Sequence, residues 1–282
     1  SILLEKNGQR LAFVRRDEGW VIASAGGAPA KTAALRQLLL DLAAIEKLEP
    51  RTDDPALYDR LGLTDQALRI ALGAASKEAA GKEKVLYLGK SAGGGADRRF
   101  ARVEGEARAW LVKAALEPEL QAGRWADLAL PTMPRADVRA LTITQADGER
   151  LDIGRDSAQA ENFAIRNLAA GEEPAYPTVA NGIAGALASL GYEDVRRADD
   201  LDFSNPVIAR YEDWDGFVLT LRLVQADGGW WLRVAAQAPG GDGASDPRAD
   251  KVNALSQWAF KLPDYKAEDL TKRKTDLLKA SQ

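Results

Sequence analysis

The chain has 282 residues, of which 46% are hydrophobic and 28% charged, and its formal net charge is −4. This balance is that of a globular protein with enough residues to bury one or two cores. Histidine and cysteine are absent, which excludes disulfides, thiolate nucleophiles, histidine general bases and zinc sites with imidazole ligands. Acidic and basic residues are interspersed, so we expect no nucleic-acid partner.

The N-terminal residues predict a β-hairpin. Residues 2–6 and 9–14 flank Asn7-Gly8, and this dipeptide is the strongest short hairpin signal because a type I′ turn needs positive φ at both positions. The chain starts on Ser1, inside an apolar run and without a methionine. We therefore expect that an upstream export signal or membrane anchor has been removed.

A helix is predicted over residues 33–46, with Thr32 as its N-cap. Apolar side chains recur there with the 3.6-residue period of an amphipathic helix that packs on one face. That face consists of Leu35, Leu38, Leu39, Leu42 and Ile45.

Gly89-Lys90-Ser91 raises the question of a phosphate-binding loop. The motif G-x-x-x-x-G-K-[ST] requires glycine at position 84, where this sequence has lysine. It also requires a helix directly after the serine, and the glycines at 93–95 disfavour one. We predict instead two strands, 85–88 and 100–103, joined by a loop.

After residue 140 the same order of elements returns. We therefore predict a tandem duplication with domains 1–138 and 139–282. Each domain is expected to be an α+β unit in which a helix covers an antiparallel sheet, and the first is expected to carry an extra β-hairpin around residues 84–103. The matched segments are 3–13 with 141–153, 32–54 with 178–200, 68–72 with 219–223, 109–113 with 230–234, and 125–138 with 258–270.

The second helix is predicted over residues 179–191. Its glycines, Gly182 and Gly185, lower helicity, and we interpret them as a sign of close backbone approach, with an exposed helix face as the alternative. Four side chains of the two helices are expected to be buried against their own sheets: Leu38, Leu42, Ile183 and Leu187.

Clustered carboxylates raise the possibility of glycoside hydrolysis, with solvated turns as the alternative. They are Asp53-Asp54, Glu193-Asp194, Asp199-Asp200-Asp202 and Glu212-Asp213-Asp215. Residues 240–250 place Asp242, Asp246 and Asp250 roughly as in a calcium loop, but without the ligand order or closing glutamate of an EF-hand. We interpret this segment as a linker, and we predict no catalytic, cofactor-binding or metal-binding residues.

Tryptophan is the remaining signal for binding, because exposed tryptophan favours interaction surfaces. Trp230 and Trp231 are adjacent, so on a strand they point to opposite faces, one toward the core. The candidate interaction surface is Trp214, Trp230 and Trp231. The tryptophans expected in the core are Trp20, Trp110, Trp125 and Trp258.

Five segments together resemble a bacterial family catalogued as domain of unknown function 4340: "DEGWVIAS", "LLLDLAAIEKLEP", "DDPALYDRLGL", "VLYLGK" and "WAFKLPDYKAEDL". The resemblance implies an N-terminal membrane anchor followed by an α+β region at the periplasmic face of the inner membrane. It also implies genes that lie beside those of an ABC-2 type transporter and a gliding-motility-type auxiliary protein. It carries no catalytic residues over to this chain.

These observations leave three functions open. The first is a non-catalytic accessory module of an ABC-type transport system, which binds a transporter subunit, a companion protein or the exported material. The second is a carboxylate-based hydrolase acting on envelope polysaccharide. The third is a small-ligand or lipid binder with a cavity between the halves. We expect the first, without a cofactor.

Overall fold

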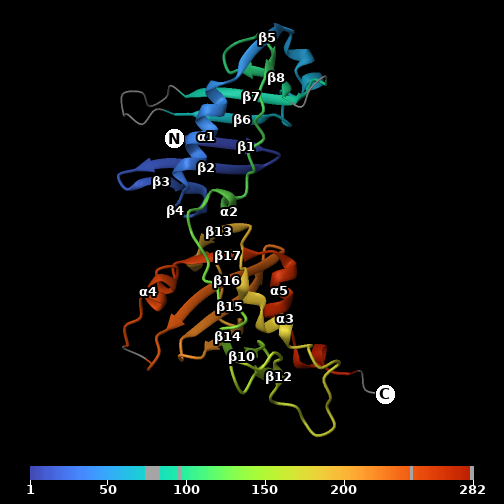
Figure 1. Ribbon diagram of the computed structural model, residues 1–282. Helices are drawn as coiled ribbons and strands as arrows, with labels where there is room; N and C mark the ends of the chain where they lie inside the picture. The colour runs from blue at the N-terminus through green and yellow to red at the C-terminus, as the bar shows by residue number, and fades with distance from the viewer. Residues whose placement is uncertain (74–82, 94–96, 242–243, 280–282) are drawn as a thin grey trace. The chain divides into compact units, whose positions relative to one another are not determined.

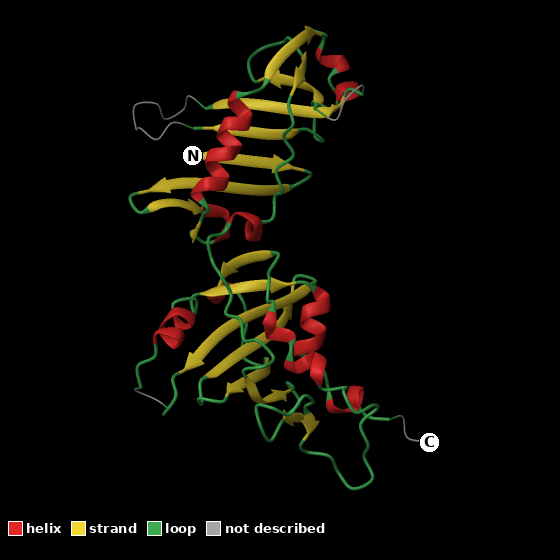
Figure 2. Ribbon diagram, viewed as in Figure 1, coloured by secondary structure: helices red, strands yellow, loops and turns green. Residues whose placement is uncertain are grey.

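The computed structural model of the chain describes residues 1–73, 83–93, 97–241 and 244–279. The chain forms two compact units, Ser1–Asp127 and Leu128–Gln282, and each contains one antiparallel sheet with few helices (Figures 1 and 2). The boundary suggested by the sequence, between 138 and 139, falls at the start of the first strand of the second unit. Among the described residues, no helix combines the length and the apolar character needed to cross a membrane.

The first unit folds as a nine-stranded sheet in the order β4-β3-β2-β1-β6-β7-β8-β9-β5. In β1 and β2, buried side chains alternate with more exposed ones, since neighbouring side chains of a strand face opposite sides of the sheet. The strands are β1 (Ile2–Lys6), β2 (Gln9–Arg16), β3 (Gly19–Ile22), β4 (Ala28–Pro29), β5 (Glu46–Pro50), β6 (Leu68–Leu72), β7 (Lys84–Ser91), β8 (Arg98–Val103) and β9 (Trp110–Lys113), and the helices are α1 (Thr32–Ala43) and α2 (Ala122–Trp125).

The predicted N-terminal hairpin is confirmed. β1 pairs with β2 in antiparallel register, and the turn has φ values of 51° at Asn7 and 78° at Gly8. Both positions lie in the left-handed region, as a type I′ turn requires. The same turn joins two later strands at Asp227-Gly228, where φ is 49° and 71°, a hairpin that the sequence reading did not single out.

Helix α1 crosses one face of the first sheet (Figure 1). Leu35 and Leu38 are buried against it, but Leu42 is only half-buried, so the prediction of a buried Leu42 is wrong. The capping prediction is also wrong, because the N-cap is Lys31 and no side chain caps the helix. The helix ends at Ala43, earlier than predicted, since the chain enters the edge strand β5 three residues later.

The second unit folds as an eight-stranded sheet in the order β12-β11-β10-β14-β15-β16-β17-β13. Helices α3 and α5 lie together beside its strands (Figure 2). The strands are β10 (Val138–Thr144), β11 (Arg150–Gly154), β12 (Ala164–Ile165), β13 (Asp194–Arg197), β14 (Val207–Asp213), β15 (Val218–Ala226), β16 (Gly229–Gln237) and β17 (Trp258–Leu262), and the helices are α3 (Asn181–Ala184), α4 (Pro247–Asn253) and α5 (Asp264–Leu270).

The second predicted helix is much shorter than expected. Only α3 is α-helical, and a 3₁₀ turn follows it. Ile183 and Leu187 are nevertheless buried, as predicted. The close-approach interpretation is wrong for Gly182, because a Cβ added there would meet no atom within 4 Å, and at Gly185 the contacts are ordinary, with Asn181 O at 3.4 Å. The glycines shorten the helix instead, since only proline has a lower helix propensity than glycine.

The two sheets differ by one strand rather than by a hairpin. The hairpin β7–β8 follows β6, which pairs with β1, and β15–β16 follows β14, which pairs with β10. The predicted extra hairpin in the first half is therefore wrong, and the additional strand is the two-residue β4. Three sequence matches are also displaced. Two align β6 with β15 and β9 with β16, one strand too late, and the third aligns the segment after β9 with β17. Short alternating segments are interchangeable in this way, since every central strand carries the same pattern.

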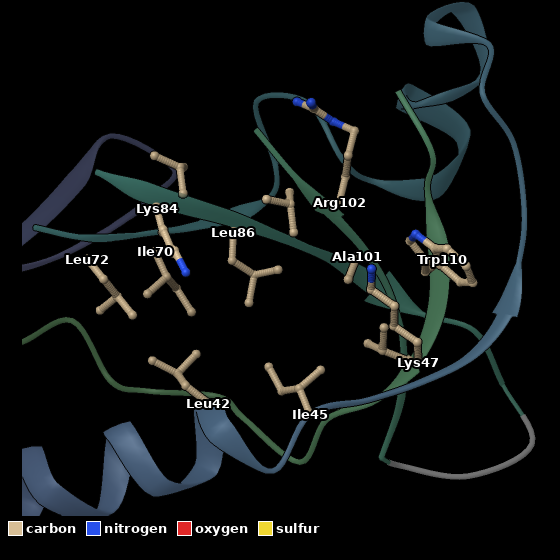
Figure 3. A pocket seen from close by; sticks show the side chains of 13 residues that line it. Leu42, Ile45, Lys47, Ile70, Leu72, Lys84, Leu86, Ala101, Arg102 and Trp110 are labelled. Carbon is tan, nitrogen blue, oxygen red and sulfur yellow. The ribbon is translucent and has the colours of Figure 1, made fainter. Parts of the chain in front are cut away.

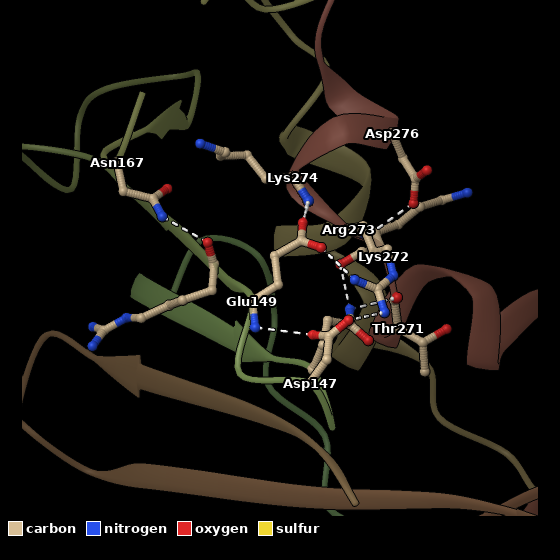
Figure 4. Close-up of polar contacts among 10 residues, drawn as sticks. Asp147, Glu149, Asn167, Thr271, Lys272, Arg273, Lys274 and Asp276 are labelled. Atoms are coloured by element: carbon tan, nitrogen blue, oxygen red, sulfur yellow. Dashed lines mark hydrogen bonds and ion pairs between the residues drawn. The ribbon is translucent and has the colours of Figure 1, made fainter. Parts of the chain in front are cut away.

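A C-terminal clamp, formed by Arg273, Asp147 and Glu149, fastens the end of the chain to the β10–β11 turn (Figure 4). The Arg273 guanidinium donates to Asp147 at 2.7 Å and also to Glu149. The side-chain amide of Gln145 adds a bond of 2.9 Å to the carbonyl of Thr271. The hydrogen bond from Arg273 lowers the pKa of the Asp147 carboxyl below its usual value.

Candidate binding groove

An apolar groove of about 260 Å³ lies where α1 ends over the first sheet. Leu42 and Ile45 form one wall, and the chain turns between them from the helix toward β5. Both side chains are half-buried, whereas the earlier leucines of the helix face are buried. The groove therefore exists because the helix stops before its apolar face has covered β7, β8 and β9.

The sheet provides the floor of the groove (Figure 3). Its residues share one face of the sheet. Along a strand they lie two positions apart, and between strands the ladder places them side by side, as it pairs Ile70 with Leu86. Ala101 lies between Leu86 and Trp110 (Figure 3), and its small side chain leaves space beneath Ile45. The main floor residues are Ile70, Leu72, Leu86, Ala101, Trp110 and Val112.

Positive charge borders this apolar surface. Lys84 extends from the first position of β7, and its ammonium points into the groove toward Leu42 (Figure 3). Lys47 lies at the other end, where its ammonium is 4.7 Å from the centre of the Trp110 ring and 3.9 Å from Glu106. Among the residues that the structure describes, no acidic side chain lines the groove. The arrangement is complementary to a molecule with an apolar body and an anionic group.

Arg102 is the third cation at the groove, but its side chain points away from it (Figure 3). The guanidinium lies 4.9 Å from the ring centre of Tyr58 and 4.7 Å from that of Tyr87. Stacking between two aromatic rings holds it on the other side of the sheet. Arg102 is therefore not available to a ligand in the groove.

The glycine-lysine-serine segment lies within strand β7, which pairs with β8, so the predicted hairpin is confirmed. The tip of the hairpin, residues 94–96, lies outside the described residues. Close packing explains why position 89 is glycine, because a Cβ there would lie 2.3 Å from the carbonyl oxygen of Leu61. The buried Arg99 side chain donates to the Gly89 carbonyl at 2.9 Å. This glycine admits a neighbouring loop rather than a phosphate.

The three candidate tryptophans do not form one surface. Trp231 is 1% exposed, packs with Val224 and donates from its indole to Ala226 O at 3.1 Å, so its ring cannot contribute to a surface. Trp230 is half-buried on the other side of β16. Trp214 lies in the β14–β15 turn, at the opposite end of β15. At strand spacing, roughly 20–25 Å separates the two.

Trp214 instead borders an arginine-rich depression of about 640 Å³ on the second unit. Most of its positive charge is neutralised within the depression, for example by ion pairs of Arg150 with Asp152 at 2.8 Å and of Arg166 with Asp156 at 2.8 Å. The arginines are Arg139, Arg150, Arg155, Arg166 and Arg210. This depression is lined by charges of both signs, whereas the groove on the first unit is mainly apolar.

The clustered carboxylates hold structural positions. Asp213 is 7% exposed and accepts hydrogen bonds from the backbone N–H of Phe217 at 2.8 Å and from Arg248 at 3.0 Å. Asp202 accepts from Ser204 N–H at 2.8 Å. Hydrogen bonds from Arg108 lower the pKa of the Asp53 carboxyl. These bonds stabilise turns and ion pairs, as the alternative interpretation of the clusters expects.

The suspected calcium loop is in part a helix N-terminus. Asp246 caps α4 by accepting from Arg248 N–H at 2.7 Å, and the Arg248 side chain lowers the pKa of its carboxyl. Asp250 belongs to that helix, and Asp242 lies outside the described residues. Within the described ranges, no three acidic side chains come together as metal ligands would.

Sequence reasoning missed the groove and its lysines. It placed Leu42 and Ile45 in the core, and it noted Lys84 only as the residue that breaks the phosphate-loop motif. A signal was present, because Lys84, Leu86 and Leu88 alternate on one strand face, which puts a cation at the end of an apolar row.

Comparison with known proteins identifies a family but no individual relative. No curated protein matches the chain, and no solved structure matches it. The family model described as "Domain of unknown function (DUF4340)" matches residues 20–206, more than half of the chain. The protein therefore belongs to the DUF4340 family.

Proposed function

We propose that the protein is a non-catalytic binding module whose groove on the first unit holds the apolar part of another molecule. The observation that carries the proposal is the uncovered apolar face between α1 and strands β7, β8 and β9. Leu42 and Ile45 remain half-buried there, and apolar surface of this kind gains free energy when a partner removes it from water.

We propose further that the module works at the periplasmic face of the inner membrane, as an accessory to an ABC-type transport system. Its partner would be a transporter subunit, a companion protein or the exported material. Membership of the DUF4340 family supports this part of the proposal, through the anchored, transporter-linked organisation that the sequence resemblance implies.

The engagement of the carboxylates supports a non-catalytic role. Asp213 and Asp53 both pair with arginine, and two acidic groups of a glycosidase would need to face a common cleft. No specific feature favours the polysaccharide hydrolase, and the groove favours binding.

A photo-crosslinking experiment tests the proposed function. A benzophenone amino acid at position 42 is expected to form an adduct in cells that produce the protein, because this side chain borders the groove. The same group at Tyr176, which is 56% exposed on the second unit, is the control and is expected to form none of that adduct. Adducts that are identical at both positions, or that persist when Ala101→Leu fills the groove, would contradict the proposal.

We also propose that the two units arose by tandem duplication. The strand order supports this, since β12-β11-β10-β14-β15-β16-β17-β13 follows β3-β2-β1-β6-β7-β8-β9-β5 strand for strand, with α1 and α3 at the same place in chain order. Superposition of the two sheets on this correspondence tests the proposal. Helices on opposite faces of the superposed sheets would rule it out.

A further inference from the structure

The dimensions of the groove restrict what can occupy it. Its volume of about 260 Å³ lies just below the roughly 300–1,000 Å³ of pockets that enclose drug-sized ligands. A helix with side chains is about 10–12 Å across, which is more than a space of this volume can enclose. The groove therefore matches one narrow apolar chain better than a folded partner element.

The charges at the groove distinguish its two ends. Lys47 already interacts with Glu106 and with the Trp110 ring. The side chain of Lys84, by contrast, makes no hydrogen bond or ion pair within the part of the chain that the structure describes, and its ammonium points toward Leu42 (Figure 3). An anion at Lys84 would gain an ion pair without displacing one.

Resting on the proposed function, we infer that the groove binds a single-chain anionic amphiphile of the long-chain carboxylate type. The acyl chain lies between α1 and the sheet, over Leu86 and Ala101, and the carboxylate lies at the Lys84 ammonium. The apolar floor recognises the chain, and the Lys84 cation at the mouth recognises the headgroup.

Titration calorimetry on the full chain tests this inference, with dodecanoate and decanoate below their micelle-forming concentrations as probes. Burial of each methylene is expected to tighten binding about fourfold, so dodecanoate should bind about 15-fold more tightly than decanoate. Dodecyltrimethylammonium has the same chain with a positive headgroup and should bind more weakly than dodecanoate. Equal affinities for the two headgroups would overturn the inference.

Two variants locate the carboxylate. Lys84→Gln is expected to weaken dodecanoate binding about fivefold, as for an exposed ion pair, and the loss should shrink at high salt. Lys90→Gln is the matched control, because Lys90 is an exposed lysine of the same strand outside the groove. This variant should bind dodecanoate as tightly as the wild type does. An equal loss in both variants, or in neither, would overturn the assignment of the headgroup.

Two other variants locate the acyl chain. Ala101→Leu fills the floor and should abolish dodecanoate binding. Ile45→Glu needs no change inside the core, since Ile45 is half-buried, and it should abolish binding by placing a charged group against the acyl chain. Unchanged binding in Ile45→Glu, with circular dichroism showing a folded chain, would overturn the site even if Ala101→Leu did not fold.

The outcomes separate this inference from the proposed function. If dodecanoate does not bind but position 42 still forms its specific adduct, the amphiphile is wrong and the binding module stands. Loss of both overturns both. A dimer in sedimentation that Ala101→Leu dissociates would identify a second copy as the occupant, and it would overturn the amphiphile.

Discussion

The two units share one strand order but differ in how their sheets are covered. In the second unit, short helical segments fill the space over the sheet, and Leu187 and Leu270 are both 0% exposed. In the first unit, one longer helix buries Leu35 and Leu38 and then ends, which leaves Leu42 half-buried over the groove. The same sheet order can thus support a filled core or an open apolar site, depending on where the covering helix stops.

The largest expected effect tests that difference at one leucine of each unit. Leu187→Ala removes a fully buried side chain and should destabilise the second unit by about 2–5 kcal/mol. Leu42→Ala, at the half-buried position, should cost about 1 kcal/mol or less. Chemical denaturation followed by circular dichroism, with hydrogen exchange to identify the unit that opens, measures both. Equal costs would mean that α1 covers its sheet as completely as the second unit is covered.

A second expected effect concerns Gly89 in the first unit. Gly89→Ala would place a Cβ 2.3 Å from the Leu61 carbonyl oxygen, so backbone must move. The expected cost is about 1–3 kcal/mol, the usual range for overpacking, measured as a lower denaturation midpoint of the first unit. An unchanged midpoint would show that the 61–63 loop is free to shift.

The C-terminal clamp of the second unit predicts a dependence on pH. Because Arg273 lowers the pKa of Asp147 below its usual value of 3.8, the carboxylate stabilises the fold above that pH, and the stabilisation is lost as pH falls through the lowered value. Arg273→Gln should therefore reduce the melting temperature modestly at pH 7, and the difference from the wild type should shrink under acid conditions.

The matched control for the clamp is Arg166→Gln, which removes an exposed ion pair with Asp156 but does not fasten the chain end. It should change the melting temperature little at any pH. A difference for Arg273→Gln that grows on acidification would contradict the sign of the effect.

The smallest expected effect has the opposite direction. Gly182→Ala in α3 adds a methyl group to open space, and it should stabilise the second unit by up to about 1 kcal/mol because alanine favours the helix more than glycine does. A higher denaturation midpoint is the expected result. A lower one would revive the close-approach interpretation of this glycine and would mean that a neighbouring segment packs closely against α3.

Local signals in the sequence predicted local structure well. Asn7-Gly8 determined a turn through backbone preferences of the two residues themselves, and the adjacency of Trp230 and Trp231 predicted that one ring is buried and the other partly exposed. Such features depend on residues that are neighbours in the chain. The α+β pattern of antiparallel strands with helices followed from the same alternation and periodicity.

Features that depend on distant residues were not predictable in this way. The groove forms because α1 ends before it covers Ala101. Leu42 and Ala101 approach each other only after the strands have paired. The alternation that marks a strand does not say which strand it is, so the matches that involve β6 and β9 were displaced by one strand. The prediction of a helix over 179–191 failed because short turns can bury apolar side chains at the same spacing, when tertiary packing holds those turns in place.

Strand β5 has a further consequence, for association between chains. It lies at the edge of the first sheet, all five of its residues are exposed, and it carries Glu46, Lys47, Glu49 and Pro50. The opposite edge is the two-residue β4, which contains Pro29. Charges and prolines at edges discourage pairing with a strand of another molecule. The first sheet is thus poorly suited to recruit a partner by extending its hydrogen-bonded ladder, and recognition there is left to its faces.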